Sequence, residues 1–193
     1  MSGDSIAIFA ILFISCTLNA GIILVARFIL LNKNDIDVLS LRKIVRDEFI
    51  NSDKKNQTCL ILEDDFEFTK DQEFVNNIIN KFFNNVKKFD VLMLASNILN
   101  AQSTDYEFLQ KIIDAQTLSG YIVHRDFAPI LLQNYRESIS LLQRAGFKCY
   151  PYCFDIYMKK LQPVSNWYCL NPKVGKQIES YSDIENRVVD YEC

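Results

Sequence analysis

The chain contains 193 residues, of which 49% are hydrophobic and 23% are charged. This composition supports a buried core and excludes global disorder. Lysine and arginine together number 21 against 24 aspartates and glutamates, and no basic tract stands out, so nucleic acid is not an expected partner. The length fits one ordinary domain, or one small domain with an appendage.

An apolar segment opens the chain. Residues 6–26 contain no charged side chain, and about 20 apolar residues cross the hydrocarbon core of a bilayer. A signal peptide has a shorter apolar stretch and a basic start, which this sequence lacks. We therefore expect residues 1–32 to form a single-pass membrane anchor, with a buried helix of the globular domain as the alternative. The lysines and arginines that follow favour a cytosolic C-terminal part, whereas a lumenal enzyme needs the opposite orientation.

Residues 33–193 alternate between apolar strands and amphipathic helices. Wholly apolar runs at residues 59–62 and 90–95 predict strands that are buried on both faces. Between them, helical spacing predicts a helix over residues 71–88, capped by Thr69 or Asp71. A strand, a long crossover and a second strand predict a parallel unit, and hence an α/β fold with a mostly parallel sheet. Further predicted elements are helices at 37–49, 126–134, 137–144 and 156–161, and a strand at 120–123.

Cysteine and histidine offer few metal ligands. The chain has six cysteines but a single histidine, His124. Cys149 and Cys153 are too widely spaced for a redox pair, and no second close pair completes a zinc site. A hydrolase triad would need His124, which lies at an expected strand end and is interpreted as a surface residue. The chemistry is therefore sought among the carboxylates.

Three adjacent carboxylates follow the first buried strand. Glu63, Asp64 and Asp65 lie where ligands gather in a parallel sheet, at the carboxyl end of the strand. A hard divalent cation such as Mg²⁺ or Mn²⁺ relieves their mutual repulsion and bridges them to a diphosphate. Alternation along the chain puts Glu63 and Asp65 on one side and Asp64 on the other. The alternative is an acidic turn that favours the dipole of the next helix.

Five motifs in order carry a resemblance to a known family. Residues 62–66, Leu-Glu-Asp-Asp-Phe, resemble the LEDD motif of glycosyltransferase family 25. That family includes the lipooligosaccharide galactosyltransferases of bacteria and the procollagen galactosyltransferases, and it has relatives in large DNA viruses. Residues 90–94 resemble the strand after that motif, and residues 117–132 resemble its Thr-x-x-Tyr block. Residues 154–157 resemble the acceptor-side segment, and residues 172–184 the closing signature. The resemblance covers roughly residues 39–185, which makes residues 33–193 a family 25-like domain.

The resemblance implies a fold, a reaction and a site. The fold is GT-A-like, and the reaction is inverting transfer of galactose or glucose from a UDP-sugar to a glycan, lipid or protein acceptor. Mn²⁺ or Mg²⁺ binds at Glu63 and Asp65, where it neutralises the diphosphate leaving group. The resemblance assigns the donor to Glu63, Asp64, Asp65, Tyr121 and Gln177.

The resemblance also assigns the catalytic base. Asp155 is the first candidate, with a helix N-cap as its alternative, and Asp183 is the second, with capping or turn formation as its alternative. Tyr121 is assigned to the donor base, although a strand tyrosine is more often a core residue. Trp167 and Tyr168 are either a sugar platform or structural aromatics.

One family feature has no counterpart in this sequence. The family opens with a strand that carries an Asn-Leu-x-x-Arg-like motif, and the apolar segment occupies that place. A viral member with a shortened or rebuilt N-terminal part fits this pattern, anchored in a host membrane. Two hypotheses follow: a metal-dependent hexosyltransferase, or an inactive glycosyltransferase-like binding protein or truncated remnant.

Overall fold

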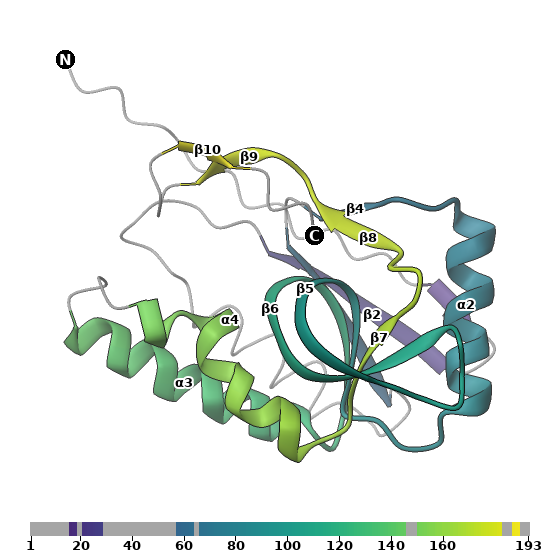
Figure 1. The fold of residues 1–193 in the computed structure, drawn as a ribbon, viewed down its shortest axis with the longest axis horizontal. Coiled ribbons are helices and arrows are strands. Elements are labelled where there is room, and N and C mark those ends of the chain that lie inside the picture. Colours follow the sequence, from purple (N-terminus) through teal and green to yellow (C-terminus); the bar gives the residue numbers. More distant parts are fainter. Residues whose placement is uncertain are drawn as a thin grey trace.

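A central sheet organises the protein. The computed structural model describes residues 16–18, 21–28, 57–63, 66–145, 150–182 and 187–189. The main sheet of this described part has the strand order β1-β2-β3-β6-β5-β7 (Figure 1). Its strands are β1 (Cys16–Leu18), β2 (Gly21–Phe28), β3 (Thr58–Glu63), β5 (Val91–Ser103), β6 (Leu109–His124) and β7 (Trp167–Leu170).

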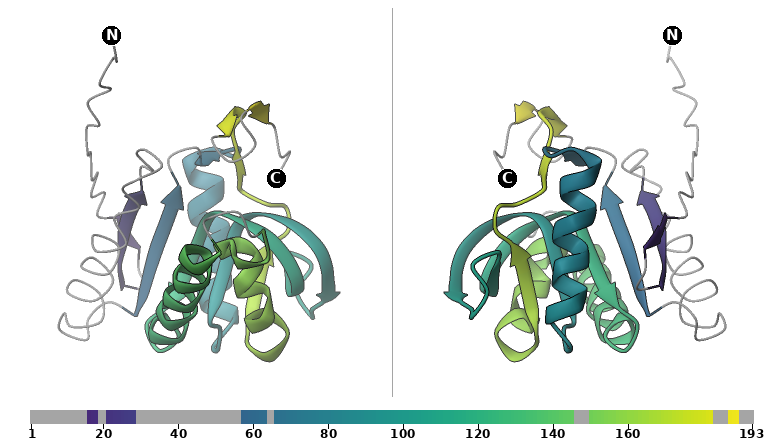
Figure 2. Two further views of the ribbon diagram at one scale, coloured as in Figure 1. Left: turned by 90° about the vertical axis from the view of Figure 1, so that its left-hand side faces the viewer. Right: turned by 90° about the vertical axis from the view of Figure 1, so that its right-hand side faces the viewer.

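Helices cover both faces of this sheet. Helix α2 lies on one face, while α3 and α4 lie on the other (Figures 1 and 2). Two short antiparallel pairs, β4 with β8 and β9 with β10, lie at one end of the sheet. The helices are α2 (Gln72–Asn85), α3 (Ala128–Arg144), η2 (Tyr150–Tyr152), α4 (Phe154–Tyr157) and η3 (Met158–Val164). The short strands are β4 (Phe66–Phe68), β8 (Gly175–Gln177), β9 (Ser180–Ser182) and β10 (Arg187–Val189).

The pairing of the strands corrects the prediction of a mostly parallel sheet. Strand β6 pairs antiparallel with β3, β5 and β7, and β1 pairs antiparallel with β2. Parallel pairing joins β2 to β3 and β5 to β7. Because β3 and β5 are both antiparallel to β6, they run in the same direction, as the crossover through α2 requires. The prediction failed because β6, which comes later in the chain, lies between them.

The two faces of the sheet carry separate hydrophobic clusters. Side chains alternate along β3, so that Cys59 and Ile61 join one cluster while Leu60 joins the other. Strand β5 alternates in the same way, which explains why both strands are wholly apolar in sequence. The cluster on the α3 side contains Phe127, Leu131, Tyr135, Met158 and Trp167. The cluster on the α2 side contains Val75, Ile78, Ile79, Phe82 and Phe89.

Helix α2 confirms the helix predicted over residues 71–88. Its N-cap is Asp71, whose Oδ1 accepts a hydrogen bond from the backbone N–H of Phe74 at 2.8 Å. Its buried residues are Val75, Ile78, Ile79 and Phe82, whereas Phe74 is 38% exposed. The helix therefore forms a standard amphipathic cover of the sheet.

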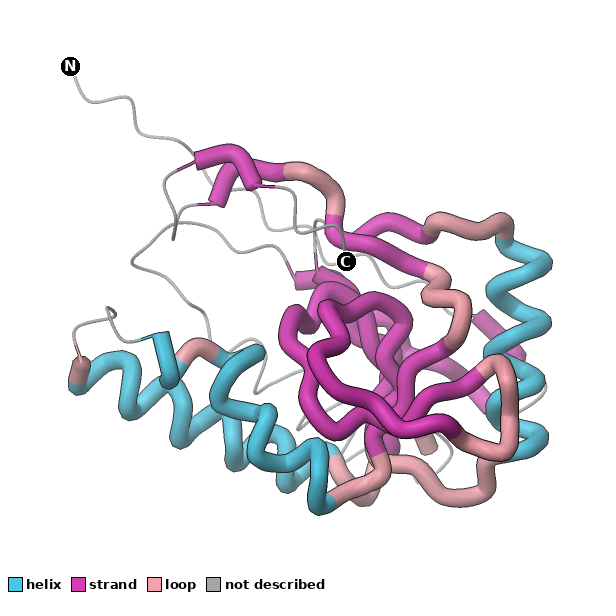
Figure 3. Tube along the Cα trace, viewed as in Figure 1, coloured by secondary structure: helices cyan, strands magenta, loops and turns pink. Residues whose placement is uncertain are grey.

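Helix α3 joins two predicted helices into one. The sequence analysis placed separate pieces at residues 126–134 and 137–144, but residues 128–144 form a single helix. Neither glycine nor proline occurs between the two pieces, so nothing interrupts the helix. The third predicted strand is also longer than expected, because residues 109–124 all belong to β6. Figure 3 shows this strand-rich centre between the two groups of helices.

Most of the predicted anchor and the helix over residues 37–49 lie outside the described residues. Strands β1 and β2 cover residues 16–18 and 21–28, which overlap the second half of the apolar segment. Strand β2 lies parallel to β3 at the edge that β6 does not occupy. Within the described ranges, no helix is both long and apolar enough to cross a membrane. The anchor stays a prediction.

Candidate functional site

Strands β3 and β6 bring two of the predicted site residues to the same face. Ile61 of β3 is paired with Tyr121 of β6, and Glu63 lies two residues beyond Ile61 on the same side of β3. The Tyr121 hydroxyl lies 2.9 Å from the hydroxyl of Tyr135, which belongs to α3. Both tyrosines are buried. A pair of buried hydroxyls therefore lies beside the carboxyl end of β3.

The charges around this pair identify its neighbours. Burial raises the pKa of Tyr121 well above its ordinary value, and the nearby charges of Tyr135 and Glu63 add to that increase. Burial also raises the pKa of Tyr135, and the carboxylates of Glu63 and Asp155 contribute. Both phenols are consequently neutral at physiological pH. Since one hydroxyl of the pair donates to the other, the pair has one further hydroxyl hydrogen to donate.

Asp155 approaches the same cluster from α4. Its partly buried carboxyl group has a pKa above the usual value because of burial, although hydrogen bonds from the backbone N–H groups of Thr117 and Ile156 oppose this effect. The N-cap of α4 is Cys153, so Asp155 lies within the first turn instead of at the cap. A carboxylate with a raised pKa is suited to accept a proton from a hydroxyl group.

The residue after the acidic triplet is held by two glycines. The ring of Phe66 packs against Gly120 of β6 and Gly175 of β8, and a Cβ atom at either position would overlap the ring. Phe66 is also paired with Gln177 across the β4–β8 ladder. The structure therefore fixes the chain immediately after residues 64–65 and brings Gln177, a predicted donor residue, next to it.

Three of the seven predicted site residues thus act on Tyr135: Tyr121 through a hydrogen bond, and Glu63 and Asp155 through their charges. Gln177 lies beside Phe66, whereas Asp64, Asp65 and Asp183 lie outside the described residues. In the described part of the chain, no three His, Cys, Asp or Glu side chains gather into a group that could hold a metal ion. Glu63 supplies the carboxylate oxygen that Mg²⁺ and Mn²⁺ favour, and it requires partners from residues 64–65 to complete a binding group.

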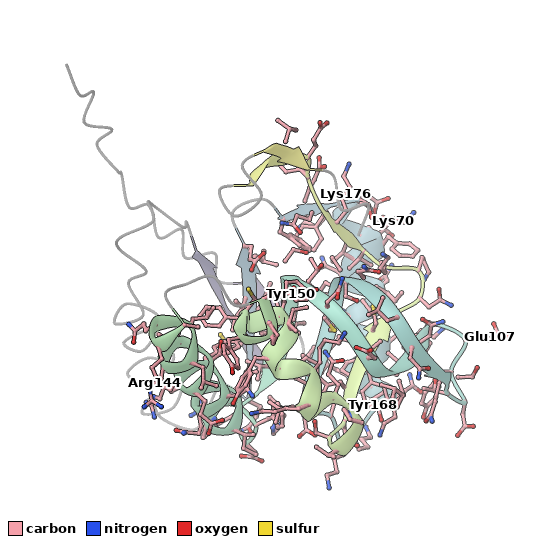
Figure 4. All side chains as sticks on the ribbon, turned by 60° about the vertical axis from the view of Figure 1, so that its left-hand side comes forward. Lys70, Glu107, Arg144, Tyr150, Tyr168 and Lys176 are labelled. Atoms are coloured by element: carbon pink, nitrogen blue, oxygen red, sulfur yellow. The ribbon has the colours of Figure 1, made fainter. Side chains whose placement is uncertain are left out.

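The proposed sugar platform has divided roles. Trp167 is fully buried and meets Phe127 edge to face, so its ring is a core residue and offers no exposed surface. Tyr168 points to the opposite face and lines an open groove of about 410 Å³ together with Lys87, Lys88 and Tyr106. In Figure 4, Tyr168 lies well away from Lys70 and Lys176, which mark the end of the molecule with β4 and β8. None of the seven residues predicted to bind the donor or metal or to act as the base lines this groove.

Sequence reasoning missed Tyr135, Thr117 and Lys159. The position of Tyr135 could have been inferred, because it lies four residues after buried Leu131 on the same face of α3. Thr117 adopts a φ of 73°, which no local pattern in the sequence indicates. Lys159 forms an ion pair with Asp114, and the contact depends on the tertiary fold.

The architecture defines the protein as a mixed α/β protein with helices on both faces of its sheet. No protein-family model and no curated protein matches the chain. Among solved structures, the crystal structure of A197 from STIV is similar, with a TM-score of 0.43 and 16% sequence identity. The similarity covers 84% of this chain and 79% of that one.

Proposed function

We propose that the protein is a glycosyltransferase that moves a hexose from a UDP-sugar to a hydroxyl acceptor. The proposal is supported by one observation: Glu63, Tyr121 and Asp155, which the family resemblance selected from separate motifs, all act on Tyr135, Tyr121 through a hydrogen bond and the two carboxylates through their charges. These residues come from β3, β6 and α4, so their convergence does not follow from sequence proximity. Carboxylates that act on buried titratable groups are enriched at functional sites.

In this proposal Asp155 is the catalytic base. Its carboxylate takes the proton of the acceptor hydroxyl, and the acceptor oxygen forms a bond to the anomeric carbon of the sugar. The bond between that carbon and the diphosphate oxygen breaks, and its electron pair leaves with UDP. The acceptor attacks opposite the leaving group, so the anomeric configuration inverts. Burial helps because it moves the pKa of Asp155 towards neutral pH, where a base accepts protons more effectively.

Glu63 and Asp65 are the proposed metal ligands, with Asp64 and Gln177 near the donor. A bound Mn²⁺ or Mg²⁺ supplies charge neutralisation for the diphosphate. In the Tyr121–Tyr135 pair one hydroxyl donates to the other, so a single hydroxyl hydrogen is left to donate, and buried donors stabilise developing negative charge. Asp183 remains the second candidate for the base. Family 25 membership, the GT-A type and the N-terminal anchor belong to the same proposal.

The test measures binding and transfer separately on the full chain. UDP with Mn²⁺ at millimolar concentration is expected to raise the melting temperature, because a ligand that binds the native state stabilises it. UDP-galactose and UDP-glucose are then supplied with a panel of glycan, lipid and peptide acceptors, and UDP release is measured. Asp155→Asn is expected to lower transfer by about 100-fold or more, the typical contribution of a general base, and to retain UDP binding.

Two matched substitutions control for charge alone. Asp126→Asn removes a carboxylate whose side chain is 87% exposed. Glu67→Gln removes the carboxylate of β4 that forms an ion pair with Lys176 of β8. Both variants should behave like the wild type, whereas Glu63→Gln should weaken the Mn²⁺-dependent binding of UDP. Wild-type transfer in both Asp155→Asn and Glu63→Gln would contradict the proposal.

The second candidate is an inactive glycosyltransferase-like binding protein. It is favoured by the absence of the Asn-Leu-x-x-Arg-like motif from the sequence and by β2, an apolar strand that pairs with β3 instead. This candidate predicts UDP or glycan binding with no release of UDP from either donor. A thermal shift without turnover would therefore favour it.

A further inference from the structure

The helical segment that carries Asp155 has two polar faces. Asp155 and Lys159 are four residues apart across the junction of α4 and η3, and Gln162 follows three residues later in the 3₁₀ turn. This spacing places all three on one side of the segment. Lys160 lies on the other side, where its Nζ is 3.3 Å from Glu137 Oε2 of α3 and 3.7 Å from the centre of the Tyr157 ring.

The first face is bonded to a short stretch of β6. Lys159 Nζ lies 2.7 Å from Asp114 Oδ1. Gln162, which is fully buried, accepts a hydrogen bond from the Ala115 N–H at 2.7 Å and donates one to the Ala115 carbonyl at 2.9 Å. Asp155 accepts its hydrogen bond from the backbone of Thr117. One face of the helical segment thus contacts residues 114–117 at three positions, through one ion pair and through hydrogen bonds.

The backbone of β6 is distorted where it meets Asp155. Thr117 has a φ of 73°, a region that β-branched residues rarely adopt. Such a conformation is strained and persists only where surrounding contacts hold it. The bonds at Asp114 and Ala115 supply such contacts just before the distortion.

We propose that Lys159 is a positioning residue: with Gln162 it ties the helical segment to residues 114–117 of β6 and so holds Asp155 against the Thr117 N–H, beside Tyr135. The inference rests on the role proposed above for Asp155. Lys159 acts through Asp155 and does not touch the substrate. The proposal thus gives a function to Lys159, which lies outside all of the family-like motifs.

The charges that face Asp155 set the expected pH effect. Tyr135 faces it from α3, Lys159 lies on its own helical segment, and Asp114 of β6 lies behind Lys159. The positive charge of Lys159 lowers the pKa of Asp155, against the larger effect of burial. Removing that charge therefore raises the pKa of Asp155, and the carboxylate forms only at higher pH.

The experiment compares two neighbouring lysines in the full chain. Lys159→Met is expected to move the titration of the Asp155 carboxyl carbon to higher pH, followed by NMR with ¹³C-labelled aspartate and assigned with Asp155→Asn. The acid limb of the transfer rate should move in the same direction. The rate on the plateau should fall about 10- to 100-fold, since a displacement of about 1 Å can cost 100-fold. Lys159→Arg should restore both properties.

Lys160→Met is the matched control, because it removes an adjacent lysine from the opposite face. It should leave the Asp155 titration and the transfer rate unchanged. The inference is overturned if Lys159→Met titrates like the wild type, or if Lys160→Met produces the same change. Should Lys159→Met fail to fold, Asp114→Asn breaks the same contact from β6, and a wild-type rate in that variant would also overturn it. If the protein has no transferase activity, the NMR titration still decides whether Lys159 controls Asp155.

Discussion

The two faces of the sheet bury different kinds of side chain. The α2 face is an apolar core, in which Phe82 is fully buried and meets Phe83, Phe89 and Tyr168 edge to face. The α3–α4 face buries polar and titratable groups among its apolar residues, including Cys59, the Tyr121–Tyr135 pair and Gln162. Burying polar groups is costly unless they are hydrogen-bonded, so proteins retain them where they serve a purpose. The first face is thus an apolar core, whereas the second face carries the residues of the candidate site.

The largest expected effect comes from removing the centre of the apolar face. Phe82→Ala should lower the free energy of unfolding by about 3–5 kcal/mol, because it removes buried area and leaves a cavity. The measurement is chemical denaturation followed by circular dichroism. Phe74→Ala, on the same helix but at an exposed position, is the control and should cost far less. Equal losses in the two variants would contradict the assignment of α2 as a cover whose buried face supports the fold.

Alkaline pH should loosen the α3–α4 face. Burial raises the pKa of Cys59 from 9.0 to about 12 and that of Cys169 to about 11, and both thiols lie in the α3-side cluster. The folded state keeps these protons at a pH where the unfolded chain has released them. Their contribution to stability is therefore complete below pH 9 and is lost as the pH rises through the folded pKa values.

The magnitude of this effect follows from the shift. The rise in the pKa of Cys59 from 9.0 to about 12 corresponds to at most about 4 kcal/mol in the free energy of unfolding, at about 1.4 kcal/mol per pH unit. Cys59→Ala should be slightly less stable than the wild type at pH 8 and more stable at pH 11, as measured by urea denaturation at both values. Parallel pH profiles for the two proteins would show that the Cys59 thiol is not buried as described.

Gln162 offers a test of the polar contacts on the same face. Gln162→Leu leaves the N–H and carbonyl of Ala115 without their side-chain partners, and we expect a loss of roughly 2–3 kcal/mol for two buried groups. Thermal and chemical denaturation measure the loss. Gln133→Leu, at an exposed position of α3, is the control and should change stability by less than about 0.5 kcal/mol. If Gln162→Leu is as stable as the wild type, the hydrogen bonds between Gln162 and Ala115 do not tie the helical segment to β6.

A substitution at Gly120 tests how the packing of Phe66 supports the acidic triplet. An added methyl group overlaps the Phe66 ring, so Gly120→Ala should cost about 1–2 kcal/mol through overpacking. It should also weaken the Mn²⁺-dependent binding of UDP, because Phe66 directly follows the acidic triplet. The double variant Gly120→Ala/Phe66→Leu makes room for the methyl group and should recover part of the stability. An additive double variant would indicate that the overlap is relieved elsewhere.

Local patterns were enough to predict the layered architecture. Apolar runs without alternation, as in residues 59–62 and 90–95, occur where both faces of a strand are buried, and the helical stripe of α2 requires a sheet to cover it. A cap at Thr69 or Asp71 was predictable because a side-chain oxygen satisfies N–H groups that the helix leaves unpaired, and the structure selects Asp71. Each of these properties depends on neighbours within a few residues.

The sequence by itself therefore determined the two buried strands and the helix between them, while its candidate site residues stay a prediction. Only the tertiary structure decided that β6 lies between β3 and β5, that Tyr135 joins Tyr121, and that Lys159 and Gln162 grip β6 beside Asp155. The physical reason is range. Periodicity and capping reflect interactions within one or two turns of chain, whereas strand order and contacts between distant side chains depend on how all the elements share one core.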